Sequence, residues 1–217
     1  MRNQFDKQLE ELHTALIQMG ALCERAIRSA VESVLENDPQ KARTAVKIAE
    51  ETDKKERDVE SLCLKLLLHQ QPVARDLRQI SAALKMITDM ERIGEQAGDI
   101  AEIVLTADVC FYASRFPLSD MAASALQMVT KSVDSYVNMD LEMAKWVILE
   151  DDVVDEGFVR MKQELLKEQN WEGAECALDL LMIAKYLEKI ADHAVNIAEW
   201  VEFAITGVHR RGAKPVD

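Results

Sequence analysis

The sequence predicts an all-α protein made of two similar halves, and three observations support this fold class. Gly (7) and Pro (4) are scarce among the 217 residues, 48% of the chain is hydrophobic, and the good helix formers Ala, Leu, Glu, Lys and Met are plentiful. The segment MERIGEQAGDIAEIV at 90–104 recurs 97 residues later as LEKIADHAVNIAEWV at 187–201, with seven identical positions. In both copies apolar residues recur at alternating steps of four and three, the period of helices packed in a bundle.

Proline and turn residues divide the chain into six long helices. Pro39, Pro72 and Pro117 mark three helix starts, because proline is tolerated in the first turn. Asp38 and the pair Ser119–Asp120 are cap or first-turn candidates for the second and fourth helices. We expect the helices, packed lengthwise and antiparallel, at about residues 5–36, 39–70, 73–107, 117–138, 140–169 and 172–206.

The helices group three and three, which predicts two domains at residues 1–110 and 111–217. The repeated segment belongs to the third helix of each half. The second helices match at a different offset, 102, at which Asp38 and Ala42 correspond to Asp140 and Ala144. The connection between the second and third helices is shorter in the second half, which accounts for the change of offset from 102 to 97. The chain is therefore two versions of one unit.

Charge and motifs exclude several classes of function. The net charge of −13 supplies no basic field for nucleic acid and would repel anionic lipid. The N-terminal residues lack the apolar run of a signal peptide, and no run of 18 apolar residues predicts a membrane span. The four cysteines contain no C-x-x-C pair, so we expect a cytoplasmic protein with reduced thiols. No phosphate-binding loop or hydrolase motif occurs, which favours a protein that is not an enzyme.

The chemistry in the chain is concentrated in two acidic stripes on the third helices. Both copies carry acids or amides at i, i+4 and i+8, namely Glu91, Glu95, Asp99 and Glu188, Asp192, Asn196. Like charges at this spacing repel one another unless a cation lies among them. The second helices offer further carboxylates, Asp53 in the first half and Asp151 and Asp155 in the second. Such oxygen ligands suit iron, manganese or zinc, so we expect a two-helix metal site on each half.

Two other interpretations of the stripes remain open at this stage. A stripe opposite the apolar seam of a helix is also what a solvated or partner-docking face looks like. A carboxylate-bridged bundle with a metalloenzyme or metal-buffering role is the alternative function. The Glu-x-x-His fragment of di-iron bundles occurs once, as Glu10 and His13, although such proteins need it on two helices.

The chain resembles the PhoU family of phosphate-transport regulators over nearly its whole length. The most specific stretch is QQPVARDLRQISAALKMITDMERIGEQAGDIAE at 70–102, together with its second copy LEKIADHAVNIAE. The resemblance implies two three-helix bundles related by pseudo-twofold symmetry, with metal clusters on the acidic motifs already named. The sequence departs from the family pattern at Ala49, where an acid is common, and at Asn196, where an aspartate is expected.

The resemblance also implies a role and partners. Family members restrain phosphate uptake and phosphate-starvation signalling as adaptors between the ATPase subunit of a phosphate ABC transporter and a sensor histidine kinase. A homodimer is among the assemblies that the resemblance leaves open.

Overall fold

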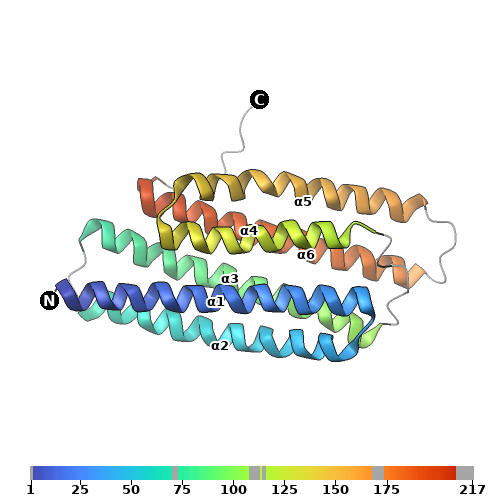
Figure 1. The fold of residues 1–217 in the computed structure, drawn as a ribbon, viewed down its shortest axis with the longest axis horizontal. Coiled ribbons are helices and arrows are strands. Elements are labelled where there is room, and N and C mark those ends of the chain that lie inside the picture. Colours follow the sequence, from blue (N-terminus) through green and yellow to red (C-terminus); the bar gives the residue numbers. More distant parts are fainter. Residues whose placement is uncertain (1, 70–72, 108–112, 114–115, 168–173, 209–217) are drawn as a thin grey trace.

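The computed structural model describes residues 2–69, 73–107, 113, 116–167 and 174–208, and in these ranges the chain forms six long helices (Figure 1). Their bounds are α1 Arg2–Glu36, α2 Pro39–His69, α3 Ala74–Thr106, α4 Leu118–Asn138, α5 Leu141–Lys167 and α6 Ala174–Thr206. All six run along the long axis of the molecule (Figure 1). The predicted all-α class and the six elements are confirmed, with each described boundary within a few residues of the prediction.

Helix starts follow the predicted signals at some joints and not at others. Pro39 is the first residue of α2, as expected. Pro117 is the N-cap of α4 and provides no side-chain hydrogen bond, and Ser119 and Asp120 lie in the first turn, one of the two places predicted for them. Pro72 lies outside the described residues.

The two halves form three-helix repeats that share one core and are related by pseudo-twofold symmetry. Helices α1, α2 and α3 contact one another, as do α4, α5 and α6, and the repeats meet through α3 against α6 and α1 against α4. The seams predicted on the third helices are buried, for example Met90 and Ile93 on α3 and Leu187 and Ile190 on α6. Core residues from all six helices join in one hydrophobic cluster. Each repeat therefore buries part of its apolar surface against the other.

The first joint of each repeat has the same backbone geometry at an offset of 102. Asn37 and Met139 adopt left-handed conformations, with φ of 50° and 52°. The next residues, Asp38 and Asp140, donate their backbone N–H to the carbonyls of Ser33 and Ser135, at 3.0 and 2.9 Å. This capping pattern satisfies carbonyls that the end of a helix leaves unpaired. The duplication inferred from the sequence thus extends to the hydrogen bonds of the turn.

Asp38 and Asp140 also cap the helices that follow them. Asp38 Oδ1 accepts from the backbone N–H of Gln40 at 2.8 Å, and Asp140 Oδ1 accepts from that of Met143 at 3.0 Å. The matched pair Ala42 and Ala144 is fully buried in both repeats. The offset of 102 is therefore a structural register as well as a sequence match.

Glycines bring α2 unusually close to α3 in the first repeat. A Cβ atom on Gly94 would lie 3.0 Å from Thr52, and one on Gly98 would lie 3.2 Å from Ala49. The lack of a side chain outweighs the loss of helix propensity here, because it permits direct contact between the two helices. The repeated segment carries Ala191 and Val195 at these positions in α6, so the approach is specific to the first repeat.

The cysteines only partly follow the prediction of reduced thiols. Cys23 and Cys63 are free and buried. Cys176 is disulfide-bonded, so the prediction is wrong at that position. Cys110 lies outside the described residues. As to membrane spans, none of the described helices combines the length and the apolar character that crossing a bilayer requires.

Because the two caps have the same geometry, their contributions to stability can be tested by matched substitutions. We expect Asp140→Ala and Asp38→Ala each to lower the free energy of unfolding by about 1 kcal/mol, since each removes a side-chain acceptor from an N-terminal N–H. Urea denaturation followed by circular dichroism measures both. Asp58→Ala, which removes an exposed carboxylate from the middle of α2, is the control, and a loss as large as in the cap variants would contradict the assignment.

Candidate functional site: two acidic clusters and a polar bridge

The first acidic cluster consists of Asp53 and Glu56 on α2 and Glu91 and Glu95 on α3. Burial raises the pKa of Glu91, and the negative charges of Glu95 and Asp53 raise it further, although Arg92 opposes them. Burial also raises the pKa of Glu56, with Glu60, Glu91 and Asp53 adding to the effect. The predicted residues Asp53, Glu91 and Glu95 are thus brought into one electrostatic neighbourhood.

Arginines of the same helices partly neutralise this first cluster. Arg57 Nη2 lies 2.9 Å from Asp53 Oδ2, one helical turn away. Arg92 forms ion pairs with Glu91, at 3.5 Å, and with Glu95. These pairs are exposed, and exposed pairs of this kind contribute only about 0–1 kcal/mol.

The second acidic cluster consists of Asp151 and Asp155 on α5 and Glu188 and Asp192 on α6, all four predicted from the sequence. Burial raises the pKa of Asp151 to about 6, and the charges of Asp155, Asp192, Asp152 and Glu188 contribute. Burial likewise raises the pKa of Asp155, with Glu188 and Asp192 as the next causes. The second helix and the third helix of this repeat therefore do converge on one carboxylate-rich place.

One carboxylate oxygen of the second cluster lacks a partner. Lys185 and Lys189 form ion pairs with Glu188, and Lys189 also pairs with Asp192. Asp151 Oδ1 is buried without a hydrogen-bond partner in the described part of the chain. Asp151 corresponds at an offset of 102 to Ala49, the residue that faces Gly98, so a carboxylate here occupies a position suited to an apolar side chain. This second cluster is the more electrostatically strained of the two.

The third member of each stripe turns away from its acidic cluster. A spacing of four residues rotates by about 40° per step on an α-helix, so positions i and i+8 differ by about 80°. Side-chain exposure accordingly rises from 27% at Glu91 to 47% at Glu95, and from 14% at Glu188 to 40% at Asp192. Of the third members, which we expected among the metal ligands, Asn196 donates to Asp89 of the other repeat, and Asp99 lies within electrostatic range of both Glu95 and Tyr186 of α6.

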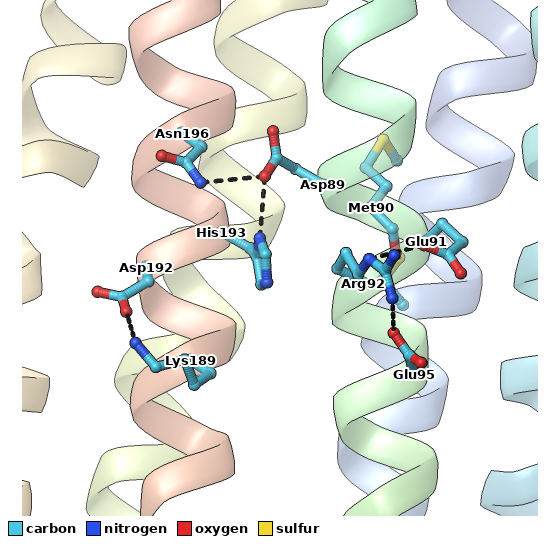
Figure 2. A network of polar contacts seen from close by, with 10 residues as sticks. Asp89, Met90, Glu91, Arg92, Glu95, Lys189, Asp192, His193 and Asn196 are labelled. Carbon is cyan, nitrogen blue, oxygen red and sulfur yellow. Dashed lines mark hydrogen bonds and ion pairs between the residues drawn. The ribbon is translucent and has the colours of Figure 1, made fainter. Parts of the chain in front are cut away.

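A polar bridge joins α3 to α6 at this place (Figure 2). Asp89 Oδ1 is in contact with His193 Nδ1 at 2.9 Å and accepts from Asn196 Nδ2 at 3.0 Å. Figure 2 shows Asp89 reaching from α3 between the two helices, with the pairs Arg92–Glu95 and Lys189–Asp192 on their own helices. No sequence pattern pairs Asp89 with His193, because the two residues lie 104 positions apart.

The pseudo-twofold axis creates a second version of this bridge with different chemistry. At an offset of 97, Asp89 corresponds to Tyr186 and Asn196 to Asp99. Burial raises the pKa of Tyr186, and the charges of Asp99 and Glu102 on α3 raise it further. Asp99 therefore lies within electrostatic range of α6, as Asn196 lies beside α3.

The described residues do not by themselves form a finished metal site. Within the ranges that the structure describes, no group of three or more Asp, Glu, His or Cys side chains is arranged to hold one ion. The arrangement offers instead two acidic surfaces, each built from two helices, with cationic side chains of the same chain on their outer edges. Such surfaces attract metal cations or basic groups of a partner.

Comparison with known proteins gives one consistent result. The family model described as the PhoU domain matches residues 16–104 and 118–201, one match on each repeat. A phosphate-specific transport system accessory protein PhoU homolog of Synechocystis is 33% identical, covering 95% of this chain and 93% of that protein. A homolog of the same description from Clostridium acetobutylicum is 32% identical, covering 95% and 96%.

Solved structures agree in fold. The crystal structure of PhoU from Pseudomonas aeruginosa superimposes with a TM-score of 0.84 at 27% identity, covering 94% of this chain and 100% of that one. The phosphate transport system regulatory protein PhoU from Streptococcus pneumoniae gives a TM-score of 0.85 at 22% identity, covering 95% and 99%. The second likeness concerns the fold alone.

The raised pKa of Asp151 predicts an unusual pH dependence in metal-free protein. The folded state binds a proton at Asp151 more tightly than the unfolded chain, whose ordinary value is 3.8. The charged carboxylate therefore lowers stability above about pH 6, and the penalty disappears as the pH falls toward 4. With chelator present, we expect Asp151→Asn to raise the free energy of unfolding by about 1–2 kcal/mol at pH 7.5, after a discount for solvent screening.

Urea denaturation of parent and variant between pH 4 and 8 measures this difference. The gain should shrink steadily below pH 6. Asp152→Asn, a more exposed neighbour on the same helix, is the matched control. A gain that is independent of pH, or equal in the control, would show that Asp151 is not the strained group.

Proposed function

Because this chain belongs to the PhoU family, we propose that it is a cytoplasmic negative regulator of phosphate uptake and of phosphate-starvation signalling. In this role it acts as an adaptor between the ATPase subunit of a phosphate ABC transporter and a sensor histidine kinase. The observation that carries the proposal is the match to accessory proteins of phosphate transport at about one-third identity over 95% of the chain. Both repeats take part in the match, so the similarity is not confined to one motif.

The geometry supports an adaptor better than a catalyst. Burial raises the pKa of Cys23 and of Cys63 to about 12, so neither thiol is an activated nucleophile. The acidic clusters lie at the surfaces of long helices, where they are open to another protein. A rigid bundle with long exposed faces suits docking against helices of a partner.

The adaptor role predicts a phosphate phenotype and two physical contacts. We expect a deletion strain to take up phosphate and to express starvation genes while phosphate is ample, because the restraint on transport and signalling is lost. Radiolabelled phosphate uptake and a starvation reporter measure these effects. Co-purification with the transporter ATPase and with the kinase, each tested separately, measures the contacts. Normal phosphate control in the deletion strain would overturn the proposal.

We further propose that the acidic clusters bind metal ions, with iron, zinc or manganese as candidates. The second cluster fits a cation best, because Asp151 Oδ1 is buried without a partner in the described residues and four carboxylates share the site. Oxygen-only ligands of this kind suit hard cations. The chemistry that a bound ion would supply is charge neutralisation, and Asp151, Asp155, Glu188 and Asp192 are the residues that would hold it.

Elemental analysis of untagged protein purified without chelator tests the metal proposal. We expect metal in the parent, and its loss in a Glu91→Ala, Glu95→Ala, Glu188→Ala, Asp192→Ala variant of equal helix content. Separate Glu91/Glu95 and Glu188/Asp192 double variants assign the metal to a repeat, and we expect the second repeat to hold more. Absence of metal in the parent would contradict the proposal.

The alternative function makes a different prediction. A metal-buffering or metalloenzyme bundle would bind metal or turn it over in a strain whose phosphate control is normal after deletion. The phosphate phenotype therefore separates the two functions even where both bind metal.

A further inference from the structure

The outward face of α5 carries a row of exposed aliphatic side chains, called here the α5 stripe. It contains Leu149 (70% exposed), Val153 (51%), Val159 (46%) and Leu166 (87%). At 100° per residue these side chains spread over about 140° of the outward side of the helix, with the exposed acids Asp152 and Glu156 between them, opposite the buried Val147, Val154 and Met161. Single exposed aliphatic residues are ordinary on a protein surface, whereas a row on one face indicates an interaction site.

The first repeat provides an internal control for this feature. The buried positions of α2 and α5 match at an offset of 102, for example Thr52 with Val154 and Val59 with Met161. At the same offset the stripe residues Leu149, Val153 and Val159 correspond to Lys47, Glu51 and Arg57, all exposed. Three of the four stripe positions are therefore charged on α2 and aliphatic on α5, whereas Leu166 corresponds to Leu64, which is also exposed (46%). Folding of the unit does not require the aliphatic residues.

Acids surround the aliphatic side chains of the stripe. A hollow of about 630 Å³ along α5 is lined by Val153 and Val159 together with Asp152, Asp155 and Glu156. Its one lining cation, Arg160, lies 3.9 Å from Asp120 of α4. A partner in this hollow would thus contact aliphatic side chains that are surrounded by negative charges.

Lysine side chains lie over the rings of Trp146 and Phe158, two aromatic residues of α5 next to the stripe. Lys131 Nζ lies 3.3 Å from the ring centroid of Trp146, and Lys162 and Lys185 lie 4.7 and 5.2 Å from that of Phe158. These contacts give the flanks of α5 cationic partners from within the protein. Among the described residues, no lysine makes such a contact with the side chains of the α5 stripe.

We propose that the α5 stripe docks a basic amphipathic helix of a partner protein. The stripe runs from residue 149 to residue 166, about 26 Å along the helix axis, which accommodates a partner helix of roughly the same length. Leucine-like side chains of that helix would pack against Leu149, Val153 and Val159, and its lysines or arginines would pair with Asp152, Asp155 and Glu156. Such complementarity gives specificity and rapid association. A second copy of this chain fits less well, because acids would then face acids and the net charge is −13.

A designed peptide tests the proposal without knowledge of the partner. The probe is an 18-residue fluorescent peptide of Leu and Lys, with leucine at i, i+3, i+4 and i+7. The comparison peptides are a scrambled sequence of the same composition and a Leu/Glu peptide of the same spacing. Fluorescence anisotropy at physiological salt measures binding. We expect the amphipathic Leu/Lys peptide to bind at least tenfold more tightly than either comparison peptide.

Matched variants locate the binding. Leu149→Lys/Val153→Glu places on α5 the residues that α2 carries, leaves the net charge unchanged, and should weaken binding at least tenfold. Its control is the exchange Lys47→Glu/Glu51→Lys on α2, which should leave binding unchanged. Asp152→Asn/Glu156→Gln should also weaken binding, and Glu50→Gln/Glu51→Gln, with the same loss of charge on α2, should not. The altered side chains are exposed, and circular dichroism confirms that each variant is folded.

Three results would overturn the proposal. Equal binding of the parent and of Leu149→Lys/Val153→Glu would show that the stripe is not the contact surface. Equal binding of the scrambled peptide would show attraction by charge alone. A dimer of the parent in sedimentation, lost in Leu149→Lys/Val153→Glu, would assign the stripe to a second copy of the chain. The assay contains neither metal nor phosphate, so its failure would leave the proposed function untouched.

Discussion

The packing of α3 against α6 is the contact on which the rest of the molecule depends. Each of these helices also contacts the two other helices of its own repeat, so most of its circumference is covered. Small residues make this crowding tolerable: Ala97 and Ala101 on α3, and Ala194 and Ala198 on α6, are fully buried. The sector that remains uncovered holds the acidic stripe. The location of the acidic clusters therefore follows from helix packing, because charged side chains are solvated more easily in that sector than in the covered ones.

The sequence predicted the elements because the information it needed was local. Helical periodicity, prolines and the internal repeat identified six helices and their grouping. Convergence of Asp151 with Glu188 also followed, since adjacent helices joined by a short turn run antiparallel. Contacts between the repeats could not be derived in this way. Nothing near His193 in the chain identifies Asp89 as its neighbour, and the periodic seam of α3 does not say which helices it meets. Helix geometry predicts that Asp99 is rotated by about 80° from Glu91 around α3. It does not predict that α6 lies on the side to which Asp99 is rotated.

Duplication has preserved the scaffold and let the surfaces diverge. The turn before α2 and the turn before α5 each keep one residue in the left-handed conformation, an aspartate cap and a buried alanine. In contrast, α2 carries Ala49, which packs closely on Gly98, where α5 carries the partly buried Asp151. The outward faces differ as well, because Lys47, Glu51 and Arg57 on α2 correspond to Leu149, Val153 and Val159 on α5. Two equivalent frameworks therefore carry two different surfaces, as expected of a protein that contacts more than one partner.

The lysines of α6 alone do not relieve the repulsion among the carboxylates of the second cluster. Lys185 and Lys189 pair with Glu188 and Asp192 one turn away on the same helix, but such surface pairs contribute little and do not reach the buried oxygen of Asp151. A cation from outside the chain, whether a metal ion or a basic side chain of a docked helix, would lower the repulsion among the four carboxylates. Asp155 belongs both to this cluster and to the hollow of the α5 stripe. A partner that neutralised Asp155 would therefore also change the proposed affinity of the cluster for a metal, because both would bind to the same carboxylate.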